Sequence, residues 1–425
     1  MSMEANTATP KPAAQPSAYS SNYRYVIALV AFFTQIALAM CLGCLSPLGP
    51  SIREGLNMNF AQFGLLFTFT NLGTMVMLNI TGPLVDKFGV RTVLFVGQAL
   101  MGALVFLGAR TNAVWQLLAL QVFVGICNSA AGPTGSKMVV TWFPPKERGA
   151  ALGLKQAGIP VNSIIAGAVF PLIAAAGGWR LGFNILCVIL WVSALLSAFL
   201  YRDSDVMKEM SGKNAKQRVT WKEVAKDVFT RDIILLSVGL MFCMGAQYSV
   251  SSYMVTYLGR TFTAIGVGEP TIIAGRVLSI ASTGGLIGRL IFGAVSDRIF
   301  KGRRKSTIIG MNAFALVILL IIAFGADSFS VTMYFILMFL YGITAFAWTG
   351  LQLAIASELA GMKAAASAVS FTLSLGFAGM MLSPPIFGAV IDATGGNFWE
   401  WILLAAFTLI GIIIIIPVKE KRKEQ

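Results

Sequence analysis

Residues 82–91 read GPLVDKFGVR, and residues 293–298 read GAVSDR, 211 positions further along the chain. Each stretch follows an apolar block, and in each a glycine stands four residues before an aspartate that a basic residue follows. Three matched stretches in the same order indicate that a unit of about half the chain is present twice. The other two pairs are residues 147–153 (ERGAALG) with 361–366 (GMKAAA), and residues 177–180 (GGWR) with 395–399 (GGNFW).

The composition of the 425-residue chain excludes an ordinary soluble protein. Hydrophobic residues make up 56% of the chain, charged residues 12%, and the mean hydropathy is +0.77. Soluble globular chains carry about 25% charged residues. The net charge of +14 does not indicate a nucleic-acid partner, because the basic residues lie in short breaks between apolar blocks, as charges that set membrane topology do.

The reactive residue types exclude most enzyme chemistry. The chain has no histidine, which rules out a His-ligated metal, a Ser-His-Asp triad and a histidine proton relay. Cys41 and Cys44 have C-x-x-C spacing, but no second pair accompanies them, and we interpret all five cysteines as small buried hydrophobic residues. We expect no catalytic residue, no metal site, no cofactor and no enzymatic activity.

Twelve apolar segments follow a polar first stretch. Each is about 19 or more residues long, which is enough to cross ~30 Å of hydrocarbon as a helix. Glycines inside them, such as Gly284, Gly285 and Gly288, indicate close helix packing rather than strands. The predicted spans are residues 25–48, 61–80, 91–109, 114–141, 149–174, 182–200, 233–258, 272–296, 306–325, 331–356, 364–391 and 397–417.

The longest polar stretch between the segments, residues 201–232, follows the sixth segment and divides the twelve into two sets of six. The predicted fold is an all-α polytopic membrane protein with two pseudo-symmetric six-helix bundles. Residues 1–24 are rich in Pro, Ala, Ser and Thr and predict a disordered tail without a cleavable signal. The predicted parts are this tail (1–24), an N-terminal bundle (25–200), a linker (201–232), a C-terminal bundle (233–417) and a second tail (418–425).

The distribution of basic residues predicts that both termini are cytoplasmic. Twelve crossings place the termini on one side, and the loops of that side hold 24 of the 32 Lys and Arg residues. The opposite loops and the span ends beside them hold five, and the other three lie deeper inside spans. The positive-inside rule then fixes the orientation. Short loops on the opposite side favour a bacterial inner membrane.

These residues resemble the major facilitator superfamily of secondary transporters. Its most specific motif, G-x-L-x-D-[KR]-x-G-x-[KR], is nearly complete in the loop at residues 82–91 and recurs in part after the eighth span. The resemblance covers about residues 25–417. It implies a monomeric carrier in which two six-helix bundles rock around a midplane site.

The resemblance also implies a latch that joins the two halves when the cytoplasmic side is closed. Asp86 can pair with Arg91 or with another basic group nearby. Gly82 and Gly89 would let backbones approach closely. The latch residues implied in this way are Gly82, Asp86, Gly89, Arg91, Gly293, Asp297 and Arg298.

The ionisable residues inside the spans are mostly cationic. Lys137, Lys155 and Arg289 lie within spans, whereas the only acid inside the predicted limits is Glu400, at the edge of the last span. Such residues are costly in a membrane and indicate function. A positively charged, partly dehydrated cavity favours an anionic substrate.

Arg289 is the strongest candidate ligand. It lies about 12 Å along the helix from Asp297, and its guanidinium can hold a carboxylate through two parallel hydrogen bonds. Residues 288–297 (GRLIFGAVSD) also resemble span eight of the monocarboxylate and oxalate–formate carriers, in which an arginine at this spacing binds the substrate carboxylate. The alternative is a structural arginine on backbone carbonyls.

Lys155 is the second candidate, because the family fold implies that span five faces span eight across the cavity. Lys155 and Arg289 would then hold one anion from both halves, and Asn162, on the same helical face as Lys155, would be a neutral ligand. Lys155 could instead extend to the cytoplasmic interface.

Three further candidates complete the predicted site. Lys137 lies in residues 136–144 (SKMVVTWFP), which resemble the organic-anion:cation symporters, where a basic residue helps to hold substrate; it too could extend to the interface. Gln247 and Tyr248 belong to a polar cluster in span seven. That cluster fits a ligand shell and hydrogen bonds between helices equally well.

The sequence departs from these relatives at residues that serve coupling. A carboxylate often lies four residues before the span-eight arginine, where this chain has Gly285. We expect a carrier of a small organic anion, a mono- or dicarboxylate, that works as a proton symporter or an anion exchanger. Its partners would be the anion, membrane lipid, and protons or a counter-anion. The alternative is an exporter of lipophilic compounds, although span five has Gly158-Ile159-Pro160 in place of the glycine–proline pattern of drug exporters.

Overall fold

The computed structural model describes residues 21–202, 226–299, 303–396 and 398–420. Within these ranges the chain is helical and contains no strand. The predicted linker lies mostly outside the described residues, as do most of both predicted tails. The predicted all-α class is confirmed.

The N-terminal half begins with a helix that is interrupted once. Helices α2 and α3 together form the first crossing, and α5 and α6 together form the fourth. Two helices are much longer than a membrane is thick and bend at glycines. The helices are α2 (Tyr23–Gly43), α3 (Leu45–Leu56), α4 (Phe60–Gly108), α5 (Val114–Asn128), α6 (Ala131–Trp142) and α7 (Arg148–Leu200).

The C-terminal half repeats this plan. Helices α13 and the first part of α14 form one crossing, and α14 continues past a bend into the next. The helices are α10 (Arg231–Ala264), α11 (Pro270–Arg298), α12 (Arg304–Gly325), α13 (Val331–Ala345), α14 (Thr349–Thr394) and α15 (Trp399–Ile415), with the short helix η1 (Ala326–Ser328) after α12.

Twelve crossings account for these helices. Ten helical segments of the described chain are long and apolar enough to span a membrane. One of them, Arg148–Leu200, has 53 residues and leaves helical geometry at Gly177 and Gly178, so it crosses twice. Helix α15 adds a shorter apolar helix of 17 residues. The chain is therefore a multi-pass membrane protein, as expected.

The bends differ from the expectation that coil loops separate the spans. Residues 82–91, expected to be a loop, are helical except at Gly89, where φ is 82° and ψ is 160°. Gly361 has the same role in α14, with φ 74° and ψ 170°. Only glycine adopts these angles without strain, so one residue suffices to turn the chain.

Glycines also set the helix crossings in the N-terminal half. A Cβ atom on Gly73 would collide with the carbonyl oxygen of Val122, and a Cβ atom on Gly125 would collide with that of Thr70. The backbones of α4 and α5 therefore touch directly, which only glycine permits.

The same crossing recurs in the C-terminal half. A Cβ atom on Gly284 would meet the carbonyl oxygen of Phe339, and one on Gly342 would meet that of Ala281. These residues follow their N-terminal counterparts by 211 positions on one helix and 217 on the other. The duplication inferred from sequence is thus a duplication of helix packing, and the close packing predicted for Gly284 is confirmed.

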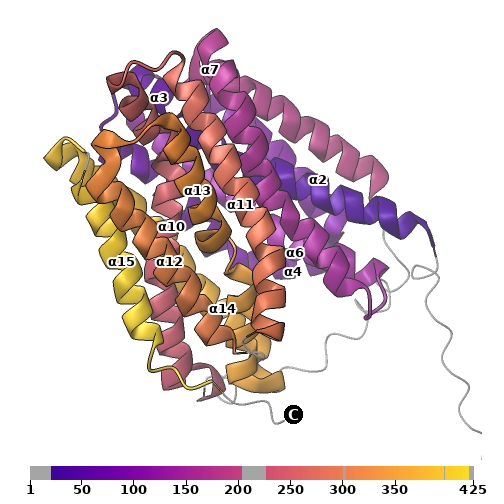
Figure 1. Ribbon diagram of the computed structural model, residues 1–425. Coiled ribbons are helices and arrows are strands. Elements are labelled where there is room, and N and C mark those ends of the chain that lie inside the picture. Colours follow the sequence, from indigo (N-terminus) through magenta and orange to yellow (C-terminus); the bar gives the residue numbers. More distant parts are fainter. Residues whose placement is uncertain (1–20, 203–225, 300–302, 397, 421–425) are drawn as a thin grey trace, which may run out of the picture.

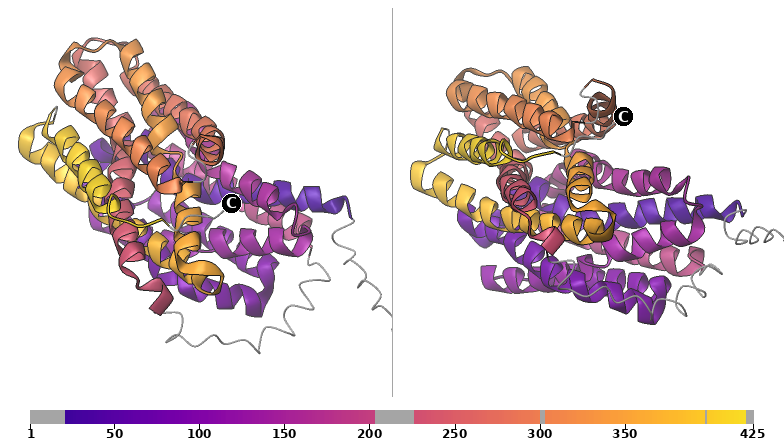
Figure 2. Two further views of the ribbon diagram at one scale, coloured as in Figure 1. Left: turned by 60° about the horizontal axis from the view of Figure 1, so that its bottom comes forward. Right: turned by 90° about the horizontal axis from the view of Figure 1, so that it is seen from below.

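The two halves meet more closely at one end than at the other. We call the end that holds Tyr23, Leu200 and Ile415 the termini end, and the other the opposite end. Figures 1 and 2 show the N-terminal half (indigo to magenta) and the C-terminal half (red to yellow) converging at the opposite end and separating toward the termini end. Helices α4 and α14, α7 and α11, and α3 and α10 pack across the interface.

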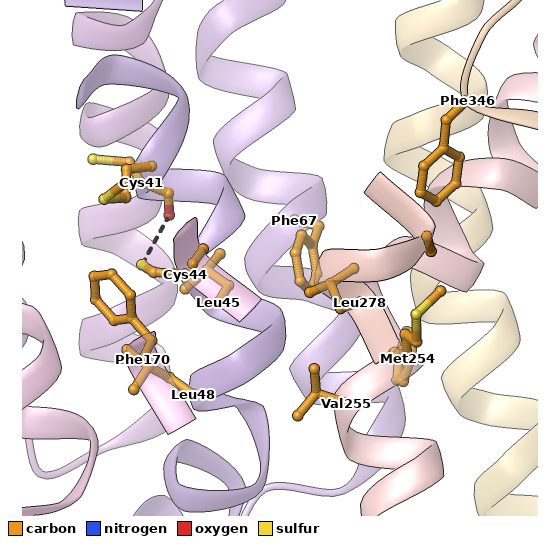
Figure 3. Close-up of a cluster of buried hydrophobic side chains, with 14 of the residues drawn as sticks. Cys41, Cys44, Leu45, Leu48, Phe67, Phe170, Met254, Val255, Leu278 and Phe346 are labelled. Atoms are coloured by element: carbon orange, nitrogen blue, oxygen red, sulfur yellow. Dashed lines mark hydrogen bonds between the residues drawn. The ribbon is translucent and has the colours of Figure 1, made fainter. Parts of the chain in front are cut away.

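One apolar core fills the N-terminal half and extends into the C-terminal half, which also holds two smaller, separate apolar clusters. Figure 3 shows Cys41, Cys44 and Leu48 on the N-terminal side and Met254 and Leu278 on the C-terminal side of this core. Cys44 is fully buried and its thiol donates to the carbonyl of Cys41 at 3.7 Å. All five cysteines are free, and four are buried, which agrees with their interpretation as small hydrophobic residues.

Candidate functional site

Arg289 lies at the interface between the two halves. It stands nine residues before the end of α11, and its half-buried guanidinium donates to two backbone carbonyls, of Phe346 through Nε and of Gln156 through Nη1, both at 3.3 Å. Phe346 belongs to the same half, whereas Gln156 belongs to α7 of the other half. Arg289 therefore joins the halves, and it has no acidic partner in the described part of the chain.

Both carbonyls are available for local reasons. In a regular helix the carbonyl of Gln156 would accept from the backbone N–H of residue 160, but Pro160 has none. Helix α13 ends at Ala345, so the carbonyl of Phe346 lies beyond the last helical turn. Carbonyls without helical donors are good acceptors for a guanidinium.

Lys155 precedes Gln156 and is 4% exposed. Its ammonium lies 3.5 Å from the carbonyl oxygen of Gly132, and its side chain packs on Gly135, where a Cβ atom would collide with it. Within the described residues its ammonium forms no ion pair. A cation with such a weak partner is costly in a buried position.

Arg289 thus binds α7 at the residue that follows Lys155, whereas the Lys155 ammonium contacts α6 of its own half. Lys155 lies about 11 Å and Arg289 about 14 Å from the end of its helix on the termini side. This is the side on which the halves separate (Figure 2, left).

The neutral candidates contact other elements. The amide nitrogen of Asn162 donates to the carbonyl of Ala39 at 3.2 Å, and its buried Oδ1 has no hydrogen-bond partner among the described residues. Tyr248 accepts a hydrogen bond from Asn71 at 3.3 Å, and its ring packs edge-on against Phe67. Gln247, next to it, is half-buried.

Asn71 is a residue that sequence reasoning missed. It is 1% exposed and joins α4 to α10 across the halves through Tyr248. The polar cluster of span seven is thus tied to the other half through Tyr248. An asparagine inside an apolar span was the only signal for this contact.

Lys137 lies elsewhere. Its ammonium forms an ion pair with Asp86 at 2.7 Å, at the termini end of the N-terminal half. The expected basic partner of Asp86 is therefore Lys137, and Arg91 is exposed. The structure does not bring Lys137 together with Lys155 and Arg289.

The latch glycines differ from expectation. No described atom lies within 4 Å of a Cβ atom built on Gly82, Gly89 or Gly293, so no close backbone approach occurs at them in this conformation. Gly89 serves the bend in α4 instead. Asp297 and Arg298 end α11, and their side chains are outside the described part of the chain.

The opposite end is closed by hydrogen bonds between the halves. The carboxylate of Asp392 accepts from the backbone N–H groups of Phe60 and Ala61 at 2.9 and 2.8 Å, which caps the first turn of α4. The hydroxyl of Tyr253 donates to the carbonyl of Phe60 at 2.6 Å. Arg53 stacks on the Phe60 ring at 3.3 Å.

The chain matches the family model described as Major Facilitator Superfamily over residues 31–384 and 277–425. It is 26% identical over 388 residues to the probable sulfoacetate transporter of Cupriavidus necator, covering 87% of each protein. It is 23% identical to the hexuronate transporter of Bacillus subtilis (87% of this chain, 89% of that protein). It is 22% identical to the probable L-galactonate transporter of Escherichia coli (93% and 90%).

A solved structure shares the fold. It is a bacterial homologue of the human lysosomal transporter Spinster in an inward-facing and unoccupied conformation. The TM-score is 0.72 at 16% identity, and the alignment covers 94% of this chain and 96% of the other.

Proposed function

The chain belongs to the Major Facilitator Superfamily, and from that premise we propose that it is a secondary carrier of a small organic anion, a mono- or dicarboxylate. The resemblance found in the sequence is thereby confirmed. The family and the relatives are transporters, so the protein is a carrier rather than an enzyme.

One observation carries the proposal of an anionic substrate. Arg289 of one half binds the carbonyl of Gln156, the residue that follows the buried Lys155 in the other half, and neither cation has an acidic partner among the described residues. A carboxylate would satisfy both by charge-assisted hydrogen bonds, whereas a lipophilic cation or neutral compound would leave both uncompensated. Relatives named for sulfoacetate, hexuronate and galactonate, all organic anions, support this reading.

Arg289 is the main anion ligand in this proposal and Lys155 the second. In the conformation described here the guanidinium donates to the carbonyls of Gln156 and Phe346. An arriving carboxylate makes stronger, charge-assisted bonds than these carbonyls do, so the guanidinium turns to it. Asn162, Gln247 and Tyr248 serve as neutral groups around the ligand.

Transport follows from alternating access. The hydrogen bonds of Asp392 and Tyr253 close the opposite end, and the anion draws the two cationic positions together nearer the termini end. The Asp86–Lys137 pair belongs to the latch of that end, together with Asp297 and Arg298. With both termini cytoplasmic, as the basic loops predict, the conformation described here faces inward. The membrane is a bacterial inner membrane, and the carrier is a monomer.

Coupling is by anion exchange or by proton symport. Gly285, one helical turn before Arg289, packs on Phe346 and leaves no room for a carboxylate beside the arginine. A proton would therefore have to travel on the substrate or on another acid.

Uptake of labelled carboxylates into proteoliposomes tests this function. Each carboxylate is offered with an inward pH gradient, with no gradient, and with unlabelled anion inside. Stimulation by the gradient indicates symport, and stimulation only by the internal anion indicates exchange. If no carboxylate moves under any condition, the substrate class is wrong and an exporter of lipophilic compounds takes its place.

A further inference from the structure

A groove runs between two helices on the outside of the N-terminal half. Helix α2 and the last part of α7 pack side by side with opposite directions. Between them lies a cavity of about 310 Å³. Its floor includes two small buried side chains, Ala37 and Ser193, and its rims include the exposed side chains of Phe33 and Leu196. Small residues facing each other between large ones leave the hollow.

The groove has the depth of one membrane leaflet. Its lining on α7 extends from Val188 to Leu200, and twelve helical steps measure about 18 Å. Half of a ~30 Å hydrocarbon core is about 15 Å. No charged residue occurs between Arg24 and Arg53 on one side or between Arg180 and Arg202 on the other. The groove therefore lies in the hydrocarbon of the leaflet at the termini end, where its neighbours are acyl chains.

Aromatic and basic groups surround the mouth of the groove at Leu200. The hydroxyl of Tyr23 donates to the carbonyl of Leu200 at 2.6 Å. The guanidinium of Arg202 lies 4.9 Å from the Tyr23 ring, and the indole of Trp142 donates to the Arg202 carbonyl at 3.1 Å. Tyrosine, tryptophan and arginine in this arrangement are typical of the level of lipid headgroups.

Arg202 is the cation that remains available at this mouth. Arg24, its neighbour on α2, pairs with Glu147 at 3.2 Å. Arg202 is exposed and forms no ion pair with any residue that the structure describes. A guanidinium binds phosphate oxygens through parallel hydrogen bonds.

We propose that this groove is a binding site for an anionic phospholipid of the leaflet at the termini end. One acyl chain lies along Phe33, Ala37, Ser193 and Leu196, and the headgroup phosphate lies on Arg202. On the predicted topology this leaflet is cytoplasmic, the leaflet that carries anionic lipids. The site is separate from Arg289 and Lys155, so it stands whether or not the carrier moves carboxylates.

Native mass spectrometry of the purified protein tests the site. The protein is exchanged into micelles that contain equal amounts of phosphatidylglycerol and phosphatidylcholine with identical acyl chains, and the retained lipids are counted. We expect one retained lipid, with phosphatidylglycerol preferred. Arg202→Gln should reduce that preference roughly fivefold, as one basic group near a headgroup contributes. Arg202→Lys should retain most of it.

Two substitutions separate the acyl chain from the headgroup. Ser193→Phe fills the floor of the groove, so it should abolish retention of both lipids. Val169→Phe, which adds the same ring to an exposed position outside the groove, should not. Arg231→Gln removes an exposed arginine at the start of α10 and is the matched control for Arg202→Gln.

The results that would overturn the proposal are equally specific. An unchanged lipid preference in Arg202→Gln would remove the headgroup contact. Retention in Ser193→Phe equal to that in Val169→Phe would remove the acyl-chain site. Loss of the preference on adding inorganic phosphate alone would make Arg202 a site for free phosphate. Unchanged thermal unfolding of the variants shows that each has folded.

Discussion

The two ends of the interface between the halves are held in different ways. At the opposite end, hydrogen bonds cross from one half to the other: Asp392 caps α4, and Tyr253 binds the carbonyl of Phe60. At the termini end the described ion pairs stay within one half, Asp86 with Lys137 in the first and Arg304 with Glu358 in the second. Hydrogen bonds thus join the two halves at the opposite end, whereas the described ion pairs at the termini end do not join them.

Arg289 lies between these two ends of the interface. Of the hydrogen bonds between described residues of different halves, its bond to Gln156 is the nearest to the termini end. Prolines make such cross-links possible at both levels. Pro160 leaves the carbonyl of Gln156 for Arg289, and Pro385 leaves that of Met381, which accepts from Thr68 of the other half at 2.5 Å. The two ends therefore differ in their contacts. At the opposite end donor and acceptor belong to different halves, whereas at the termini end both members of an ion pair belong to the same half.

Replacing Arg289 should have the largest effect, because it removes both the cross-link and the proposed main anion ligand. We expect Arg289→Gln to abolish uptake and to weaken anion binding by about 100-fold, in line with the roughly 2–5 kcal/mol that a desolvated charged contact contributes. Arg289→Lys should keep the charge, lose the paired geometry and retain a small part of the activity. Titration of the purified variants measures this, and unchanged affinity in Arg289→Gln would refute the assignment.

Lys155 should matter less, since it donates a single point charge. Lys155→Gln should weaken binding about tenfold and lower uptake in proportion. The matched control is Lys87→Gln, which removes an exposed lysine of the same half and should leave binding unchanged. Equal effects of the two substitutions would mean that Lys155 acts only through the overall charge.

Asp392→Asn would weaken the closed end directly. The loss of a charged cap on Phe60 and Ala61 should shift the population toward the form open at the opposite end by about fivefold. A cysteine introduced at Thr68 should then react faster with a membrane-impermeant maleimide. Glu269→Gln, a neutralised exposed acid at the same end, should leave the rate as it was.

Asp86→Asn should have the smallest effect, because an exposed ion pair contributes at most about 1 kcal/mol. We expect turnover to slow a few-fold with binding unchanged. Lys137→Gln should do the same, and the double variant should be no slower than either single one, since both lose the same pair. Weaker anion binding in Lys137→Gln alone would instead identify Lys137 as a substrate ligand.

The all-α class and the duplication of the fold could be predicted from the sequence. Spans in lipid must be long apolar helices, and the repeated stretches could be recognised directly. The bends at Gly89 and Gly361 did not follow, since a glycine beside a charged turn fits a loop as well as a kinked helix. The glycine contacts of Gly73 and Gly125 needed the neighbouring helix.

Part of the candidate site could be predicted from the sequence. Arg289 and Lys155 were apparent as cations in apolar segments, and Pro160 could have revealed the free carbonyl of Gln156. The Asp86–Lys137 pair depends on α4 and α6 lying together, and the cap by Asp392 depends on the halves meeting. Sequence spacing predicts neither contact, because each joins segments that are far apart in the chain.

The most direct test of alternate opening of the two ends is a pair of distances measured by double electron–electron resonance. Spin labels at positions 146 and 303 report on the termini end, and labels at 54 and 269 on the opposite end, in protein whose five native cysteines are replaced. Adding a transported carboxylate should shorten the first distance and lengthen the second, and Arg289→Gln should abolish both changes. Distances that ignore the carboxylate, or that respond equally in Arg289→Gln, would contradict anion-driven alternation at Arg289.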